Sequence, residues 1–260
     1  MRVALIGTGN VATSLAPALI SAGHEVMQFR GHDVVKLCEE PDVYIVAVKD
    51  DAIVKVAKAL PVAEGSVVVH TAGSVPMLDG MKHCGVLYPM QTFSKARHVD
   101  MRMVPCFVEG NDDYSRKMIR SLACSISDHV YDMTSDDRRY LHLAAVFACN
   151  FVNHCYTLAS DVLTAKGIPF DVLLPLIDET AAKVHDLSPE NAQTGPAKRY
   201  DLNIIDKHLK MLHTGLNAEI YELNAEIYEL NAEIYELMSK SIHEHDKSRG
   251  GKSRGDKSRE

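Results

Sequence analysis

The chain has 260 residues, of which 46% are hydrophobic and 24% charged, and its formal net charge is −7. This composition is typical of a globular protein with one large domain or two modest ones, and the negative charge argues against nucleic acid as a partner. No apolar run is long enough to span a bilayer and no signal peptide precedes the first strand-like segment, so we expect a cytoplasmic protein with no membrane partner. Six cysteines show no C-x-x-C or zinc-type spacing, which predicts reduced thiols and no metal site.

The first twelve residues carry the most informative pattern. Residues 3–6 form a short apolar run, typical of a strand buried on both faces, and lead directly into Gly7-Thr-Gly-Asn-Val-Ala12. Gly7, Gly9 and Ala12 match the G-x-G-x-x-G/A spacing of dinucleotide-binding turns. A helix over about residues 10–21 would then point its unpaired N–H groups at a pyrophosphate. An ordinary tight turn is the alternative, but the strand before it and the apolar helix after it favour dinucleotide binding.

The end of the second predicted strand, residues 25–30, bears on the choice of cofactor. NAD-binding sites place an acidic residue about 20 residues past the glycines, where it binds the ribose 2′-OH. This chain has Arg30 there, and Asp33 follows only later. A guanidinium suits a 2′-phosphate, so the sequence favours NADP as the cofactor. The alternative is a surface arginine with no ligand.

Strand-like and helical segments then alternate. We expect strands at 42–48, 66–70, 84–90, 104–109 and 128–132, with helices at 49–60 and 112–123. This order predicts an α/β fold with a doubly wound, mostly parallel Rossmann-like sheet. Residues 31–41 are too few for a helix and a further strand, so that edge of the sheet should be abbreviated.

The pattern becomes helical after residue 133. Helices are expected at about 134–166, 170–184 and 200–212, with no strand signal. We therefore expect a Rossmann-like cofactor domain over 1–133 and a smaller all-α domain over 134–242 for substrate binding and dimerisation.

The segment 216–237 contains three copies of Leu-Asn-Ala-Glu-Ile-Tyr-Glu, whose Leu and Ile residues form a heptad seam. The seam is explained equally well by a coiled coil with a partner and by a lengthened last helix packed on its own domain. Residues 243–260 repeat Lys-Ser-Arg and are expected to form a disordered basic tail.

Candidate ligand contacts follow the strands, because the carboxyl ends of parallel strands gather around the ligand crevice. His70 ends a buried strand beside Thr-Ala-Gly-Ser, and the loop that begins at Tyr88 is rich in hydrogen-bond donors. Substrate contacts are expected from Ser74, Gln91 and Thr92. The expected cofactor-binding residues are Gly7, Thr8, Gly9, Asn10, Val11, Ala12, Arg30, Val48, Lys49, His70, Thr71 and Ala72.

The first helix after residue 134 carries polar residues at steps of three and four on an apolar background: His142, Asn150, Asn153 and His154. Such a stripe can line a cleft or be an ordinary solvated face. We expect His142, Asn150 and His154 to be catalytic and Asn153 to contact substrate. The Gly/Pro-punctuated loop at Gln193 and Thr194 is expected to close over the same substrate.

Several of these motifs resemble one family. They are Gly-Thr-Gly-Asn-Val-Ala (7–12), Ala-Val-Lys-Asp-Asp-Ala-Ile (47–53), His-Thr-Ala-Gly-Ser (70–74), Tyr-Pro-Met-Gln-Thr-Phe-Ser-Lys (88–95), His-Leu-Ala-Ala-Val-Phe-Ala-Cys-Asn-Phe-Val-Asn-His (142–154) and Gln-Thr-Gly-Pro-Ala (193–197). Over about residues 1–213 the chain is similar to NADP oxidoreductases, assigned by similarity, that pair a Rossmann-like domain with a helical domain of unknown function. These proteins are related to pyrroline-5-carboxylate reductase and to the 6-phosphogluconate and 3-hydroxyacid dehydrogenases.

The resemblance implies NADP binding and a helical domain that often forms dimers, so a homodimer is expected. The hydroxyacid dehydrogenases carry a helical Lys-x-x-x-Asn pair, whose Asn corresponds to Asn150 and whose Lys position is Val146 here. The leading hypothesis is an NADP-dependent oxidoreductase that acts on a small carbonyl, imine or hydroxy compound held between the two domains. The missing lysine favours the alternative, an inactive dinucleotide-binding sensor or scaffold. A coiled-coil adaptor accounts for too little of the chain.

Overall fold

The computed structural model describes residues 1–30, 40–213 and 231–244. The chain divides into two compact units, Met1–Phe151 and Val152–Glu260. We expected the boundary between the α/β domain and the all-α domain at residues 133–134, which is where the strands end. The compact units instead divide after Phe151, within a helical run. Each unit is described by itself.

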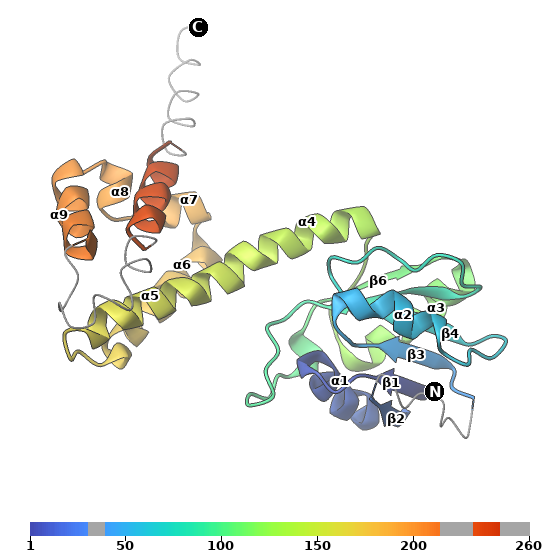
Figure 1. Ribbon diagram of the computed structural model, residues 1–260. Coiled ribbons are helices and arrows are strands. Elements are labelled where there is room, and N and C mark those ends of the chain that lie inside the picture. Colours follow the sequence, from blue (N-terminus) through green and yellow to red (C-terminus); the bar gives the residue numbers. More distant parts are fainter. Residues whose placement is uncertain (31–39, 214–230, 245–260) are drawn as a thin grey trace, which may run out of the picture. The chain divides into compact units, whose positions relative to one another are not determined.

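The first unit is built on a seven-stranded sheet (Figure 1). The strands lie in the order β2-β1-β3-β4-β5-β6-β7, and all neighbours are parallel except the antiparallel pair β5–β6. This confirms the expected α/β fold with a mostly parallel sheet. Among the described residues β2 and β7 are the two edge strands. The strands are β1 (Arg2–Ile6), β2 (Glu25–Phe29), β3 (Val43–Val46), β4 (Val67–His70), β5 (Cys84–Pro89), β6 (Cys106–Gly110) and β7 (Val130–Asp132).

Helices cover both faces of the sheet, as expected for a doubly wound fold (Figure 1). On one face, α1 (Asn10–Ser21) and α3 (Asp113–Ile126) pack against the sheet in a common core that includes Leu15 and Leu122. On the other face lies α2 (Ile53–Lys58), whose Ile53 and Ala57 are buried against β1, β3 and β4. The middle strands are buried on both faces, which explains their unbroken Val/Ile/Leu runs.

The chain leaves the sheet after β7 and enters a helical run of three parts: α4 (Ser135–Ala145), the π-helix η4 (Val146–Phe151) and α5 (Val152–Thr164). Leu141 of α4 packs against Val86, Tyr88 and Phe107. Side chains alternate across a strand, so Tyr88 and Cys84 of β5 face the same side of the sheet as α2. Through Leu141, α4 therefore packs against the same face of the sheet as α2.

The second unit is entirely helical in its described part. After α5 come η5 (Phe170–Leu173), α6 (Leu174–Asp186), α7 (Pro189–Ala192), α8 (Pro196–Arg199), α9 (Leu202–His213) and helical residues 231–244. The two single-turn helices α7 and α8 lie where we expected only a loop, and their sequences begin with proline, which is favoured in the first helical turn.

Only the last copy of the heptad repeat lies largely within the described residues. In that copy Ala232 is buried, and the Tyr235 hydroxyl lies 2.6 Å from Nδ1 of His208 in α9. Leu237, a predicted seam residue, is 65% exposed. This copy therefore packs on its own unit through one face, which agrees with the lengthened-helix alternative for residues 231–237. Residues 216–230 of the repeat, the tail from residue 245 and residues 31–39 lie outside the described residues.

Candidate functional site

A pocket of about 450 Å³ opens at the carboxyl ends of the first four strands. Its walls come from the turn after β1, from the residue after β2 and from the segments that follow β3 and β4. The structure thus brings together nine of the twelve residues expected around a cofactor. The lining residues are Gly7, Thr8, Gly9, Asn10, Val11, Arg30, Ala47, Val48, Lys49 and Thr71.

Two glycines of this turn have different physical roles. Gly7 has a φ of 134°, and a Cβ atom there would lie 2.0 Å from the Ala47 carbonyl oxygen, so no side chain fits without moving the backbone. The turn is also held by hydrogen bonds from the Gly7 N–H to the Phe29 carbonyl and from the Gln28 amide to the Gly7 carbonyl. A Cβ on Gly9 would meet no atom within 4 Å, because this residue faces the open pocket.

The N-terminus of α1 faces this turn with its backbone donors uncapped. Gly9 is the N-cap residue, no side chain accepts a hydrogen bond from the first turn, and no acidic residue lies in that turn. Helix N-termini carry unpaired N–H groups and a partial positive charge, which together favour an anion such as a phosphate. Ala12, by contrast, is a fully buried residue of α1 in the core between helix and sheet, where its small side chain lets α1 pack closely.

His70 lies beside the pocket and has a different environment from the one we expected. Its ring is 0% exposed; Nδ1 accepts a hydrogen bond from the Ala72 N–H at 3.2 Å and Nε2 lies 3.1 Å from the Pro76 carbonyl. Both nitrogens are therefore used to shape the 70–76 loop, and the ring does not line the pocket. Burial, assisted by the nearby Arg138 guanidinium, lowers the pKa of His70 from 6.5 to about 4. Ala72 is also buried, whereas Thr71 between them lines the pocket.

The sequence interpretation missed a partner of His142. The Tyr88 hydroxyl lies 3.2 Å from His142 Nδ1, and the two rings meet edge-on with centroids 6.1 Å apart. Burial raises the pKa of the Tyr88 hydroxyl above 10, although the Arg138 charge acts in the opposite direction. Tyr88 is thus protonated at neutral pH and can donate to Nδ1. In that arrangement the proton of the neutral imidazole is on Nε2.

Gly73 makes this contact possible. A Cβ atom at residue 73 would lie 2.6 Å from His142 Nδ1 and 2.9 Å from the Tyr88 ring. His142 therefore packs directly on the loop whose Thr71 lines the pocket. The Tyr88–His142 pair could have been suspected from the sequence only through the placement of Tyr88 at a strand end.

The expected polar stripe does not keep regular α-helical spacing. The π-helix η4 lies between His142 and His154 and includes Asn150. Its i→i+5 hydrogen bonds change the angular spacing on which the predicted stripe was based, so that periodicity was wrong for residues 146–151. Asn150, Asn153 and His154 are all exposed. π-Helical segments are frequent at functional sites, and this one contains Asn150, one of the expected catalytic residues.

The expected substrate residues lie on four different segments of the chain, one of which is α5 with Asn153. The Ser74 hydroxyl donates to the Asp50 carboxylate at 2.5 Å, which joins the loops after β3 and β4. Gln91 and Thr92 are exposed, and the Gln91 side-chain oxygen accepts from the Thr92 N–H at 2.8 Å. Gln193 and Thr194 lie in the second unit, where the Gln193 amide donates to the Thr194 carbonyl.

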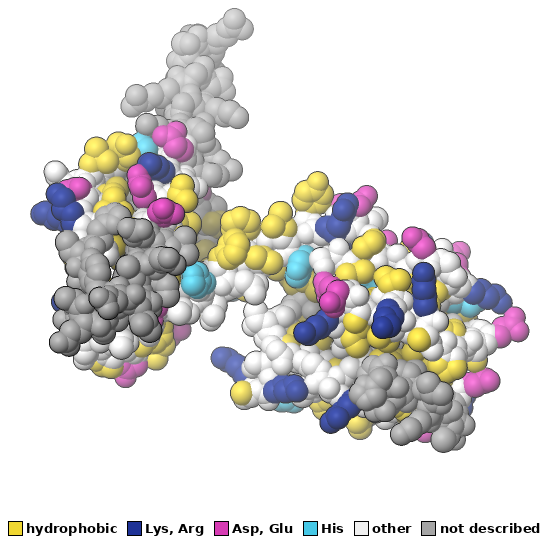
Figure 2. Space-filling view, viewed as in Figure 1, with side chains coloured by type: hydrophobic (Ala, Val, Ile, Leu, Met, Phe, Trp, Pro, Cys, Tyr) yellow, Lys and Arg dark blue, Asp and Glu magenta, His cyan; other side chains and the backbone are white. Residues whose placement is uncertain are grey.

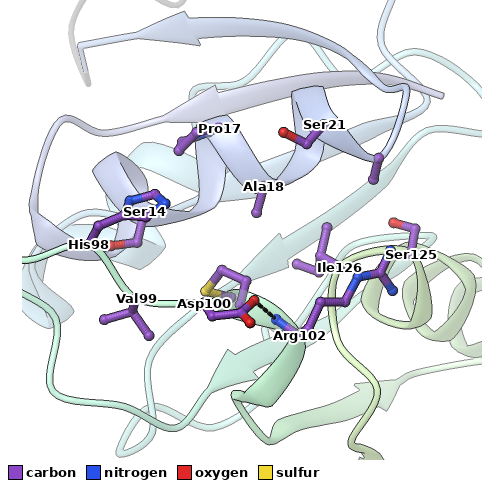
Figure 3. Close-up of a pocket in the computed structure, with 12 residues that line it drawn as sticks. Ser14, Pro17, Ala18, Ser21, His98, Val99, Asp100, Arg102, Ser125 and Ile126 are labelled. Carbon is purple, nitrogen blue, oxygen red and sulfur yellow. Dashed lines mark hydrogen bonds between the residues drawn. The ribbon is translucent and has the colours of Figure 1, made fainter.

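A second, smaller pocket of about 210 Å³ lies along the flank of α1 (Figure 3). Ser14, Ala18 and Ser21 form one wall, and the segment from His98 to Arg102 forms another. The pocket lies away from the N-terminus of α1, and no residue expected at the functional site lines it.

Two further properties bear on the class of site. In the part of the chain that the structure describes, no three His, Cys, Asp or Glu side chains come close enough to hold a metal ion. Among the same residues, no helix has the length and apolar character needed to cross a bilayer. A doubly wound sheet whose first strand ends in a glycine turn at a helix N-terminus defines a Rossmann-like protein with a phosphate-binding turn.

Comparison with known proteins identifies the family. Residues 104–242 match a domain of unknown function, DUF2520. A crystal structure from Bacteroides fragilis, named a putative NADP oxidoreductase, is 41% identical, with 94% of this chain and 98% of that chain covered and a TM-score of 0.81. The chain belongs to this DUF2520 family. No curated protein matched the chain.

More distant solved structures share the fold. An imine reductase from Myxococcus stipitatus in complex with NADP⁺ is 15% identical, with 95% of each chain covered and a TM-score of 0.58. Pyrroline carboxylate reductase from Plasmodium falciparum with NADP bound is 11% identical, with 94% of this chain and 98% of that chain covered and a TM-score of 0.55. At these identities the likeness concerns the fold.

The two glycines give a stability prediction. We expect Gly7→Ser to destabilise the protein by about 1–3 kcal/mol or more, because its side chain meets the Ala47 carbonyl. Gly9→Ser is the matched control and should leave stability unchanged or slightly raised, since serine is a good N-cap. Urea denaturation of both variants checks this, and equal losses would contradict it.

His70 gives a pH prediction. Because its folded pKa, about 4, lies below the unfolded value of 6.5, its contribution is fully present above pH 6.5 and is lost as the pH falls toward 4. A shift of this size corresponds to about 3 kcal/mol at most. Denaturation of the wild type between pH 7 and pH 4 should show this loss, and His70→Gln should have a flatter dependence. Equal slopes in the two proteins would refute the assignment.

Proposed function

We propose that the protein is an NADP-dependent oxidoreductase that transfers a hydride between the nicotinamide and a small carbonyl, imine or hydroxy compound. One observation carries the proposal: the uncapped N-terminus of α1, the open surface over Gly9 and the Arg30 side chain all line one pocket. The name of the Bacteroides fragilis relative supports the same activity.

The residues present fit such a cofactor. The space over Gly9 admits a pyrophosphate, and the first N–H groups of α1 are available to bind it. Arg30 makes no ion pair with another described residue and is exposed at the pocket. Its guanidinium can make a bidentate contact, with two parallel N–H···O hydrogen bonds to a 2′-phosphate, which a lysine cannot make. When bound, the cofactor supplies the hydride.

The chain's own residues would supply the proton. His142 is the strongest candidate for the general acid, because Nδ1 is held by Tyr88 and Nε2 has no hydrogen-bond partner among the described residues. To act as the acid the ring must be the imidazolium, whose Nδ1–H donates to the Tyr88 oxygen. Transfer of the Nε2 proton to the substrate then leaves a neutral ring whose Nδ1 accepts from the Tyr88 hydroxyl. We also propose that Asn150 binds a substrate oxygen and that His154 assists. Asn153, Ser74, Gln91, Thr92, Gln193 and Thr194 are the proposed substrate contacts.

One observation favours the alternative of an inactive dinucleotide-binding sensor. The helical lysine of the hydroxyacid dehydrogenases is replaced by Val146, which has no ionisable group. The Tyr88–His142 pair favours the enzyme, because it holds an imidazole, a group able to transfer a proton, in the same unit as the pocket.

We further propose a homodimer formed through the helical domain over 134–242. Large apolar side chains are exposed along α4 and η4 (Figure 2). They are Tyr140, Leu143, Phe147 and Phe151, with exposed fractions of 74%, 55%, 61% and 51%. Contiguous exposed apolar surface of this kind is typical of protein–protein contacts.

The test of the activity has two stages. NADPH binding is first measured by fluorescence titration with the wild type and with Gly9→Val, whose side chain would occupy the pyrophosphate's place. NADPH oxidation is then screened against small aldehydes, keto acids and cyclic imines. Normal NADPH binding by a folded Gly9→Val variant would show that the pocket is not the cofactor site.

Arg30 should discriminate between the cofactors. We expect the wild type to bind NADPH more tightly than NADH by about 1–3 kcal/mol, through a charge-assisted contact to the 2′-phosphate. Arg30→Ala should lose this preference and keep its NADH affinity. Titrations of both cofactors against both proteins test it, and an equal preference in wild type and variant would rule out the contact.

The catalytic candidates can be separated from structural residues. Asn150→Ala, His142→Ala and His154→Ala should each leave NADPH affinity close to that of the wild type while lowering turnover, by about 10²–10⁴ for a positioned acid or charge stabiliser. Melting temperature, NADPH affinity and turnover are measured on the same preparations. A stable, cofactor-competent variant with undiminished turnover removes that residue from the active site.

A further inference from the structure

A buried ion pair lies near the Tyr88–His142 contact, close enough for the Arg138 charge to act on Tyr88. The Arg138 side chain is 1% exposed and its Nη1 lies 2.7 Å from Oε2 of Glu109, whose side chain is 18% exposed. Arg138 is in the first half of α4 and Glu109 is near the end of β6. Burying two charges is unfavourable unless they are paired and their remaining hydrogen-bonding groups are satisfied.

Ser135 completes this cluster and connects it to a third element. Its N–H and hydroxyl donate to the two Glu109 carboxylate oxygens at 3.0 and 2.6 Å. The Ser135 hydroxyl oxygen in turn accepts from the Met77 N–H at 3.0 Å, and Arg138 Nη2 donates to the Val75 carbonyl at 2.6 Å. The cluster therefore joins α4, β6 and the loop after β4.

The same loop carries the residues that meet the candidate acid and the pocket. Gly73 packs against His142, and Thr71 lines the cofactor pocket. His142 follows Arg138 by four residues, so the two side chains emerge on one face of α4. The orientation of α4 on this loop thus decides where the His142 ring lies.

We propose that Glu109, Arg138 and Ser135 are positioning residues that hold His142 against Tyr88 and the 70–77 loop, so that the candidate acid stands at a fixed place relative to the cofactor pocket. The proposal deepens the proposed function, since it specifies what sets the geometry of the acid. A fork-shaped guanidinium suits this role because it binds Glu109 and Val75 at the same time.

The next residue on α4 provides a matched control. Arg139 forms an ion pair with Asp136 at 2.6 Å, but its side chain is 57% exposed and that of Asp136 81% exposed. Exposed pairs of this kind contribute little to structure. Arg139→Lys therefore makes the same chemical change as Arg138→Lys, one residue away, without touching the cluster.

The experiment follows the His142 ring by long-range ¹H–¹⁵N NMR, which reports the protonation of each ring nitrogen. It uses the full chain without cofactor at pH 7, with the His142 signals assigned from a His142→Asn variant. Tyr88→Phe gives the spectrum of His142 released from its partner. We expect Glu109→Gln and Arg138→Lys to shift the His142 signals most of the way toward the Tyr88→Phe values, and Arg139→Lys to leave them unchanged.

A role limited to stability would lower the melting temperature of the variants and leave the His142 spectrum of the folded fraction unchanged, which would overturn the proposal. An unchanged spectrum in Tyr88→Phe would overturn it as well, because the contact would then be absent in solution. If Glu109→Gln and Arg138→Lys do not fold, the same spectra are recorded for Ser135→Ala, which removes one hydroxyl and keeps the ion pair. A shift of its His142 signals toward the Tyr88→Phe values supports the proposal, and unchanged signals overturn it.

This outcome is separable from that of the proposed function. The spectra need no cofactor and no substrate, so they measure the position of His142 alone. Failure of the wild type to bind NADPH would defeat the proposed activity and leave the positioning result standing.

Discussion

The close approach of Gly7 to the Ala47 carbonyl is the constraint on which the rest of the first unit depends. β1 and β3 are neighbours in the sheet, and the chain can turn out of β1 toward α1 only by passing directly over the end of β3. A residue without Cβ and with a φ of 134° permits this path. The consequence is functional, because the path leaves the N–H groups of α1 uncapped beside an open pocket.

A second requirement is the burial of polar groups around the 70–77 loop. His70 uses both ring nitrogens within the loop, and Val75 and Met77 are bound by the α4 cluster. Nearly all buried polar groups in folded proteins have such partners; in this cluster Arg138 Nε is the described exception. The loop is consequently fixed on both of its sides, and it brings Thr71 to the pocket and Gly73 to His142.

Local patterns in the sequence predicted the fold well. Buried strands are recognisable as apolar runs, and the glycine turn predicted β1, α1 and the pocket. Both signals are local, because they depend only on residues that are neighbours in the sequence. The antiparallel pairing of β5 with β6 and the π-helix at Val146–Phe151 were not predictable in this way, because both are set by packing between distant segments. Arg138 lies in the charged run Asp-Asp-Arg-Arg (136–139), and nothing local distinguishes it from its neighbours, although tertiary contacts bury it.

A crystal structure of the protein grown with NADPH would show whether NADP binds in the glycine-turn pocket. We expect the pyrophosphate against the N–H groups of Gly9 to Val11 at the start of α1, and the 2′-phosphate within hydrogen-bond distance of Arg30. Density for the dinucleotide at another surface, with this pocket free of it, would show that the pocket is not the NADP site.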